Sequence, residues 1–399
     1  MSALLARPLP AGIPPNRGDG PRPGRRRALV DLAVLGGLGL ALVALAAWMA
    51  GWPGLNTRPR AFLVALVAQL AVYGLASAWV IRRRPRPAGA LVVIVLVALA
   101  ARLILVGTTP SASDDLYRYI WDGRIQAQGI NPYRFPPSDP ALAVYRDGAI
   151  YPLINRKGAP TIYPPVAQAV FRALYAIHPA SVPWTKLAFS GADLLTILII
   201  AGLLARLGLR PERAILYAWH PLAILEVAGS GHVDAVAILF LVLAVWARLA
   251  GPYRAGFLLA CAVLTKFYAL VALPALLRPE RRRDLRLPLT TAVAIGLAYL
   301  PFLAVGGRVF GYLGGYVQEE GIASGERFKF VRWAAWLVAR AEPPGRAGAF
   351  PVDGGRLYAG FLVLALAALA WWCWTRPLPS PRAIPARVAL LLASFLILA

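Results

Sequence analysis

Residues 88–124, AGALVVIVLVALAARLILVGTTPSASDDLYRYIWDGR, place a long apolar run directly before a segment rich in acids, arginines and aromatic rings. The apolar run, residues 88–107, has the roughly 20 residues that an α-helix needs to cross the hydrocarbon core of a bilayer. The segment that follows holds Asp114, Asp115 and Asp122 among arginines, in a chain that is otherwise mostly apolar. Two interpretations are open: a reactive site at the membrane surface, or an ion-paired segment anchored by Trp and Tyr, which collect at membrane interfaces.

Composition places the whole chain among membrane proteins. Of its residues, 59% are hydrophobic, the mean hydropathy is +0.62, and apolar runs of spanning length recur. The net charge of +24 comes largely from arginines grouped in short blocks between these runs. That grouping is the positive-inside pattern of membrane proteins and not a nucleic-acid surface. We therefore expect an all-α polytopic membrane protein whose environment is the lipid bilayer, with no nucleic-acid partner.

Several kinds of chemistry lack their motifs in this sequence. Cys261 and Cys373 lie far apart in apolar runs, so we expect neither a disulfide framework nor a metal site. A glycine-rich phosphate loop, a His-Glu-x-x-His motif and a nucleophile elbow are all missing. Without a soluble domain for a nucleotide, we expect no cofactor, and any substrate must reach the site already activated, most simply on a lipid.

Charge alternation predicts the topology. Residues 1–27 are rich in Pro, Gly and Arg and are expected to form a disordered cytoplasmic tail, with the transmembrane domain at 28–399. Basic blocks precede the first span and follow the second, so the third span should leave residues 108–183 outside the cytoplasm. Within this loop we expect short helices at 116–128 and at 166–177, the second amphipathic and lying along the membrane surface.

Further spans are expected along the rest of the chain. The turn Gly229-Ser-Gly-His-Val-Asp-Ala235 should emerge on the same side as the acidic pair. The chain stops after only about twelve apolar residues, too few to cross a bilayer, so we expect a truncated C-terminus. The predicted segments, in order, are spans at 28–50, 61–81, 88–107, 184–205, 214–227, 287–305 and 357–375, an external loop at 306–329, and a partial helix at 330–341.

Residues 255–277 form one apolar run with basic residues at both ends. A single span would place the arginines at 281–283 outside the cytoplasm, so the charge rule favours a short hairpin that enters and leaves from the cytoplasmic side. Its tip would be Thr265-Lys266-Phe267. A lysine at membrane depth is costly unless it is paired or faces a wet cavity, which indicates function. The alternative is an ordinary span with a snorkelling lysine.

The polar residues permit one mechanism without requiring it. Adjacent carboxylates such as Asp114 and Asp115 favour a proton on one of them, which suits a general base. Arg118, Arg124 and Lys266 offer cations for a departing phosphate. A base on one side of a sugar carbon and a phosphate clamp on the other perform an inverting glycosyl transfer.

Two polar residues inside spans leave alternatives open. Asp193 allows either a helix-packing contact or a site residue, and Arg102 allows either a snorkelling side chain or a phosphate contact. His220, in mid-span before a proline, is interpreted as a structural histidine.

The run Ser113-Asp-Asp-Leu-Tyr-Arg-Tyr-Ile-Trp-Asp-Gly-Arg124, with Gly129-Ile-Asn-Pro-Tyr-Arg134 and Pro160-Thr-Ile-Tyr-Pro-Pro165, resembles the bacterial GT-C membrane glycosyltransferases. Within them it is similar to the polyprenol-phosphate-mannose-dependent mannosyltransferases and their family-87-like relatives. Gly231-His-Val-Asp-Ala235 is similar to that branch's Gly-His-Asn-Asp-Ala turn, with Val233 in place of Asn. Leu264-Thr-Lys-Phe-Tyr-Ala269 resembles its Thr/Val-Lys-x-x-Pro hairpin tip, with Ala269 in place of Pro.

The resemblance implies a GT-C-like helical bundle with a large extracytoplasmic first catalytic loop carrying short juxtamembrane helices. It implies Asp115 as the catalytic base, Asp114 orienting it or the acceptor, and Lys266 facing the lipid phosphate. The other residues assigned to substrate binding are Asp122, Tyr163, His232, Asp234 and Glu226.

The implied function is an inverting transfer of a sugar, mannose by resemblance, from a polyprenyl-phosphate donor to an extracytoplasmic glycan or glycolipid acceptor. The implied location is the bacterial inner membrane. The alternatives are a lipid-linked saccharide transporter or flippase and a non-catalytic subunit of an envelope assembly complex.

Overall fold

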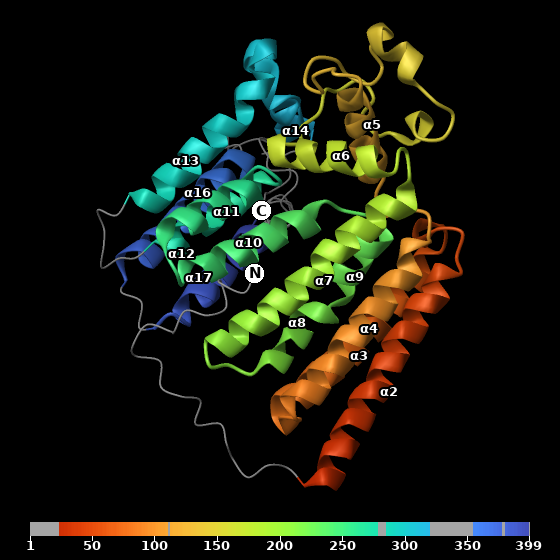
Figure 1. Cartoon of the computed structure of the whole chain (residues 1–399), viewed down its shortest axis with the longest axis vertical. Helices are drawn as coiled ribbons and strands as arrows, with labels where there is room; N and C mark the ends of the chain where they lie inside the picture. Colours follow the sequence, from red (N-terminus) through yellow and green to blue (C-terminus); the bar gives the residue numbers. More distant parts are fainter. Residues whose placement is uncertain (1–23, 111, 278–284, 320–353, 377–379, 399) are drawn as a thin grey trace, which may run out of the picture.

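The computed structural model of the protein describes residues 24–110, 112–277, 285–319, 354–376 and 380–398. All the regular structure in these ranges is helical (Figure 1), as expected from the composition. The basic cluster at 281–283, the partial helix at 330–341 and most of the N-terminal tail lie outside the described residues.

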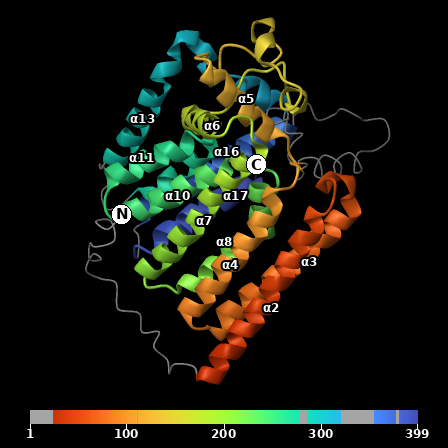
Figure 2. The same ribbon diagram turned by 45° about the vertical axis from the view of Figure 1, so that its right-hand side comes forward.

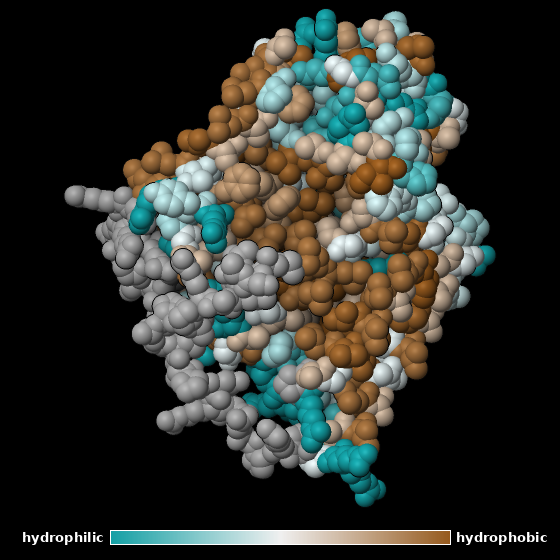
Figure 3. All heavy atoms as spheres, viewed as in Figure 1, coloured by the Kyte–Doolittle hydropathy of each residue, from teal (hydrophilic) through white to brown (hydrophobic). Residues whose placement is uncertain are grey.

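Five helices in the described part of the chain are long and apolar enough to cross a membrane, which confirms a multi-pass membrane protein. They are α2 (Arg25–Ala50), α3 (Pro59–Arg83), α4 (Pro87–Val106), α7 (Val182–Arg206) and α13 (Arg286–Tyr299), which continues into η8 (Leu300–Phe310). They match the spans predicted near these positions. A broad apolar surface separates polar ends of the molecule (Figure 3), which is the distribution expected of a chain that crosses a bilayer.

The remaining helices complete the bundle and build a layer beyond it. The helices are α5 (Asp115–Ala127), α6 (Pro165–Ile177), α8 (Ile215–Ala218), α9 (Pro221–Ile224), α10 (Asp234–Arg248), α11 (Pro252–Val263), α12 (Leu273–Leu276), α14 (Leu313–Glu319), α16 (Gly354–Thr375) and α17 (Ala383–Leu398). The short turns of helix are η1 (Leu55–Thr57), η2 (Pro140–Tyr145), η3 (Tyr151–Leu153), η4 (Pro211–Ala214), η5 (Leu225–Gly229) and η6 (Phe267–Ala272).

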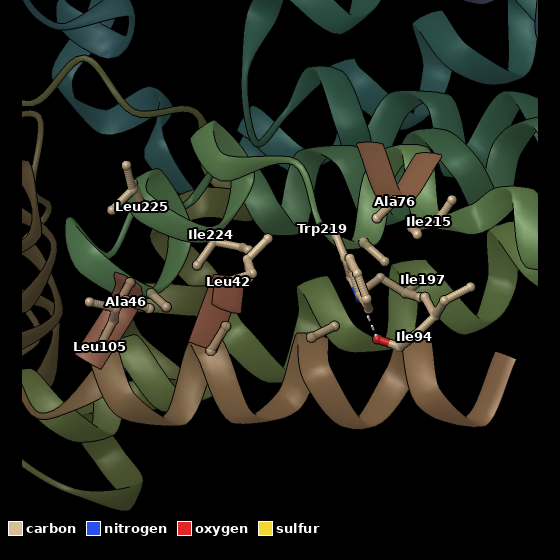
Figure 4. Close-up of a cluster of buried hydrophobic side chains, with 14 of the residues drawn as sticks. Leu42, Ala46, Ala76, Ile94, Leu105, Ile197, Ile215, Trp219, Ile224 and Leu225 are labelled. Atoms are coloured by element: carbon tan, nitrogen blue, oxygen red, sulfur yellow. Dashed lines mark hydrogen bonds between the residues drawn. The ribbon is translucent and has the colours of Figure 1, made fainter. Parts of the chain in front are cut away.

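The core between α2, α3, α4 and α7 is apolar around one tryptophan. Trp219 is fully buried and donates its Nε1–H to the Ile94 carbonyl at 2.9 Å, which satisfies its polar atom (Figure 4). Beside this core, Arg102 Nε lies 2.6 Å from Asp193 Oδ2, and both side chains are 0% exposed. Tyr217 donates to the other oxygen of Asp193. Asp193 is therefore a helix-packing contact, and Arg102 neither snorkels nor reaches a phosphate.

The apolar run at 255–277 is broken into α11, a turn at residues 264–266, and then η6 and α12. Arg248, the last residue of α10, donates from Nε to the Leu276 carbonyl at 2.6 Å. Because α11 begins just after α10 ends, both ends of this run lie at the same end of the bundle. The run therefore turns back on itself rather than crossing as one straight helix, and Lys266 lies in the turn.

The outer layer consists mainly of α5, α6 and the loop between them, above one end of the spans (Figures 1 and 2). These helices begin and end within one residue of their predicted bounds. They cross closely because Gly123 has no side chain: a Cβ there would lie 2.5 Å from the Phe171 carbonyl oxygen. The Tyr119 and Phe171 rings stack at this crossing with centroids 4.5 Å apart. The layer thus has a core of its own that holds the loop in place.

Candidate active site

A cleft of about 180 Å³ opens where the outer layer meets the turn after α11. Motifs far apart in the sequence contribute to it: the start of α5, the segment before α6, and the turn that holds Lys266. The residues that line it are Asp115, Arg118, Asn155, Arg156, Ala159, Pro160, Ile162, Tyr163, Lys266 and Tyr312.

The acidic pair lies at the N-terminal end of α5, where the helix dipole stabilises negative charge. Ser113 accepts a hydrogen bond from the Asp115 backbone N–H at 3.3 Å. Asn155 holds both acids: its Nδ2 donates to Asp114 Oδ1 at 2.8 Å and to Asp115 Oδ1 at 2.7 Å. One amide therefore fixes the orientation of two carboxylates, and Asp115 is the one that lines the cleft.

Lys266 reaches the same cleft from a different segment, the turn after α11. The backbone N–H groups of Val166 and Ala167, in the first turn of α6, donate to the Leu264 carbonyl at 3.0 and 3.1 Å. These bonds satisfy N-terminal donors that no α-helix can satisfy internally, and they join the turn to the start of α6. The ammonium of Lys266 lies 3.1 Å from Asp234 Oδ2 and 5.6 Å from the ring centroid of Tyr163. An ion pair and a ring face together stabilise a cation at this depth.

The Gly-His-Val-Asp turn packs directly against α5. Gly231 has φ +77°, and a Cβ there would lie 2.1 Å from Leu116 Cδ1. Only glycine fits both the conformation and the space. The turn places Asp234 against Lys266, and Tyr268 donates to the second oxygen of Asp234 at 3.1 Å.

His232 and Glu226 form a pair beside this turn, with 2.7 Å between Nδ1 and Oε2. Burial lowers the pKa of His232, but the hydrogen bond and negative charge of Glu226 outweigh burial and leave the pKa raised above its ordinary value. Neither side chain is among the residues that line the cleft.

Asp122 lies below the cleft rather than in it. It is 2% exposed and accepts hydrogen bonds from Arg118 Nε at 2.9 Å, Thr161 Oγ1 at 2.5 Å and Gln168 Nε2 at 2.9 Å. Arg118 also donates from Nη1 to the Ala159 carbonyl at 3.0 Å while its side chain lines the cleft. Asp122 therefore fastens α5 to the segment before α6, and it is not among the residues that line the cleft.

Arg124 does not contribute to the cleft. Its guanidinium donates to the Tyr145 carbonyl at 3.0 Å and pairs with Asp147 in the outer loop. Burial raises the pKa of Asp147, but hydrogen bonds from Arg124 and from backbone N–H groups outweigh it and lower that pKa to about 2. Arg124 and Asp147 thus fold the loop, and Arg124 is not among the residues that line the cleft.

Three polar residues of the cleft were not singled out in the sequence: Asn155, Arg156 and Tyr312. Arg156 Nε donates to Glu319 Oε2 at 2.9 Å, and Tyr312 donates to the other oxygen of that carboxylate. The only local signal for Asn155 and Arg156 was their position near the proline-rich segment before α6. The only local signal for Tyr312 was its position just after η8. Among the residues that the structure describes, no three His, Cys, Asp or Glu side chains are grouped so as to hold a metal ion.

Two known protein families match the chain. Residues 33–278 match the family described as Alpha-(1->6)-mannopyranosyltransferase, N-terminal domain, and residues 161–399 match Glycosyltransferase family 87. Each match covers more than half of the chain. Searches of curated proteins and of solved structures give no match.

The membrane-spanning bundle, the outer loop with its acidic cleft and these matches define the class: a multi-pass membrane glycosyltransferase with the GT-C fold. The chain belongs to glycosyltransferase family 87 and, over its first two thirds, to the α-(1→6)-mannopyranosyltransferase family. It is a mannosyltransferase, and the prediction made from the sequence motifs is confirmed.

Proposed function

We propose that this enzyme transfers mannose from a polyprenyl-phosphate donor to an extracytoplasmic glycan or glycolipid acceptor, with inversion at the anomeric carbon. One observation carries the proposal: Asp115 and Lys266, from segments 150 residues apart, line the same cleft. A carboxylate base and a cation in one cleft match the needs of a sugar carbon that gains an acceptor oxygen and loses a phosphate.

In the proposed reaction, Asp115 takes the proton of the acceptor hydroxyl as its oxygen attacks the anomeric carbon. The bond from that carbon to the phosphate oxygen breaks, and its electron pair leaves with the polyprenyl phosphate. Lys266 stabilises the charge that grows on the phosphate. Because the family forms an α linkage, inversion requires the mannose to be β-linked to the donor phosphate.

The neighbouring residues serve as positioning residues in this scheme. Asn155 orients Asp115, while Asp234, held by Tyr268, orients Lys266. The Tyr163 ring supports the same ammonium. A small displacement of either reacting group would lower the rate, because such catalysis depends on alignment within a fraction of an ångström.

An apolar groove of about 740 Å³ between α11 and α13 supports a lipid donor. Phe257, Val293, Leu297 and Ala298 are among the residues that line it. Ala298, at one end of the groove, packs in the same apolar cluster as Leu264, two residues before Lys266. A polyprenyl chain in this groove would bring its phosphate toward the lysine.

The distribution of arginines supports an extracytoplasmic cleft. The loops after α3 and after α7 meet at the end of the bundle opposite α5, where Arg210 Nη2 donates to the Pro85 carbonyl at 2.6 Å. Both loops are basic, and the positive-inside rule assigns such loops to the cytoplasm.

The test is transfer of labelled mannose from polyprenyl-phosphate-mannose to a membrane extract. We expect Asp115→Asn to lower transfer by about 10²- to 10⁴-fold, because removal of a general base costs that much. Asp139→Asn removes a carboxylate from the same loop and keeps its cap on η2, so it should transfer normally. Transfer by Asp115→Asn at the wild-type rate would refute the mechanism. Movement of intact lipid-linked sugar across the bilayer without a new glycoside would indicate a flippase.

A further inference from the structure

The mouth of the cleft holds a carboxylate between two residues that line the cleft. Glu319, at the end of α14, accepts from Arg156 Nε at 2.9 Å through Oε2 and from the Tyr312 hydroxyl through Oε1. Arg156 and Tyr312 line the same cleft as Asp115 and Lys266. A negative group from α14 therefore occupies an anion-binding position at the rim of the catalytic cleft.

The cleft is small for a reaction between two substrates. Its volume of about 180 Å³ is below the roughly 300–1,000 Å³ typical of pockets that enclose small ligands. A mannosyl phosphate and the hydroxyl-bearing end of an acceptor have to be present together. Displacement of a side chain at its rim would give the substrates more room.

The rim at α14 is the part of the cleft that can move with the least loss of stability. The Arg156 and Glu319 side chains are 41% and 45% exposed, and ion pairs this exposed contribute little to stability. By contrast, the segment before α14 is anchored, because a Cβ on Gly311 would lie 1.6 Å from the Thr161 carbonyl oxygen. Glu319 can thus leave the rim while Gly311 stays in place.

Among the described ion pairs that hold cations of the cleft, the pair of Arg156 with Glu319 is also the most exposed. Arg118 is held by the buried Asp122, and Lys266 is held by Asp234. A guanidinium binds carboxylates and phosphates with the same paired geometry, so a phosphate fits where a carboxylate is bound.

We propose that Glu319 occupies the place of the lipid phosphate while the cleft is empty, and that Arg156 binds this phosphate once it has displaced Glu319. This inference rests on the proposed function. It adds Arg156 to Lys266 as a second residue that binds the phosphate, and it makes Glu319 a carboxylate that competes with the substrate. Arg156 replaces Arg124 as the arginine expected to contact the donor.

The test measures the Kd of a short-chain polyprenyl phosphate for the purified full chain in detergent by calorimetry. Arg156→Gln should raise Kd about 10- to 100-fold, the loss expected for a charge-assisted hydrogen bond, and Arg156→Lys should recover part of it. Glu319→Gln should lower Kd about two- to fivefold, because it weakens the competing group. In the Arg156→Gln background, Glu319→Gln should change nothing. The matched control is Lys157→Gln: Lys157 is an exposed neighbour that donates to the Pro152 carbonyl and lies outside the cleft lining, so Kd should stay unchanged.

The outcomes separate this inference from the function on which it rests. If the wild type binds no polyprenyl phosphate, both are overturned. If Lys266→Ala weakens binding but Arg156→Gln and Arg156→Lys do not, the function stands and the role of Arg156 is wrong. If Glu319→Gln weakens binding, Glu319 is not a competitor. Uncharged polyprenol should bind the wild type and Arg156→Gln equally, and unequal binding would show that the arginine acts on the lipid chain and not on the phosphate.

Discussion

Substitution of Gly231 by alanine tests how the Gly-His-Val-Asp turn is joined to the acidic helix. The new Cβ would lie 2.1 Å from Leu116 Cδ1, and the residue has φ +77°. The left-handed conformation costs a non-glycine residue about 1–2 kcal/mol, and overpacking of a tight core adds about 1–3 kcal/mol. We therefore expect Gly231→Ala to lower the free energy of unfolding by about 2–5 kcal/mol. Because Leu116 is adjacent to Asp115, transfer should fall as well.

Gly229 supplies the matched control two residues away. It has an ordinary negative φ, and a Cβ there would meet no atom within 4 Å. Gly229→Ala should change stability by less than about 1 kcal/mol. Denaturation in detergent micelles, followed by tryptophan fluorescence, together with initial transfer rates, measures both effects. Equal stability of Gly231→Ala and wild type, or equal damage from the two alanines, would refute this account of the contact.

Three further predictions concern buried or paired charges. Asp193→Asn should lower the free energy of unfolding of the bundle by about 3–5 kcal/mol, because it leaves the charge of Arg102 buried without its partner. In denaturation experiments, replacing Arg102 and Asp193 together by leucine should cost less stability than the sum of the two single leucine replacements. Asp122→Ala should loosen the outer loop and speed its cleavage in limited proteolysis, and unchanged cleavage would show that its hydrogen bonds do not hold the loop. Because pairing with Glu226 raises the pKa of His232, this pairing stabilises the fold fully below about pH 6.5 and is lost as pH rises through the raised value. The stability difference between wild type and Glu226→Gln should therefore shrink as pH rises above about 6.5, and growth of that difference would contradict the assignment.

Much of the fold was predictable because the signals were local. The apolar runs and their arginine blocks predicted the spans, and the structure has α2, α3, α4, α7 and α13 at these positions. The two outer helices were predictable from their polar-to-apolar periodicity and flanking prolines. The break in the apolar run beside Lys266 was predictable from charge alone, because a single straight span would have placed the arginines at 281–283 outside the cytoplasm.

Which side chains meet in the cleft was harder to predict, although the helical phase of α5 would have shown that Arg124 does not face the same way as Asp115. Arg124 follows Asp115 by nine residues, which is about 180° around a helix at roughly 100° per residue, so the two point to opposite faces. This explains why Arg124 meets Asp147 and not the cleft. Asn155 and Arg156 lie in irregular chain where no period assigns a face, and only tertiary packing brings them to Asp115.

The central claim is that Asp115 takes the acceptor proton in the cleft where Lys266 binds the donor phosphate. The most direct measurement determines both the single-turnover rate of mannose transfer and the donor Kd for purified Asp115→Asn. The account predicts that the rate falls about 10²- to 10⁴-fold while the donor Kd stays unchanged. An Asp115→Asn enzyme that transfers mannose at the wild-type rate would contradict it.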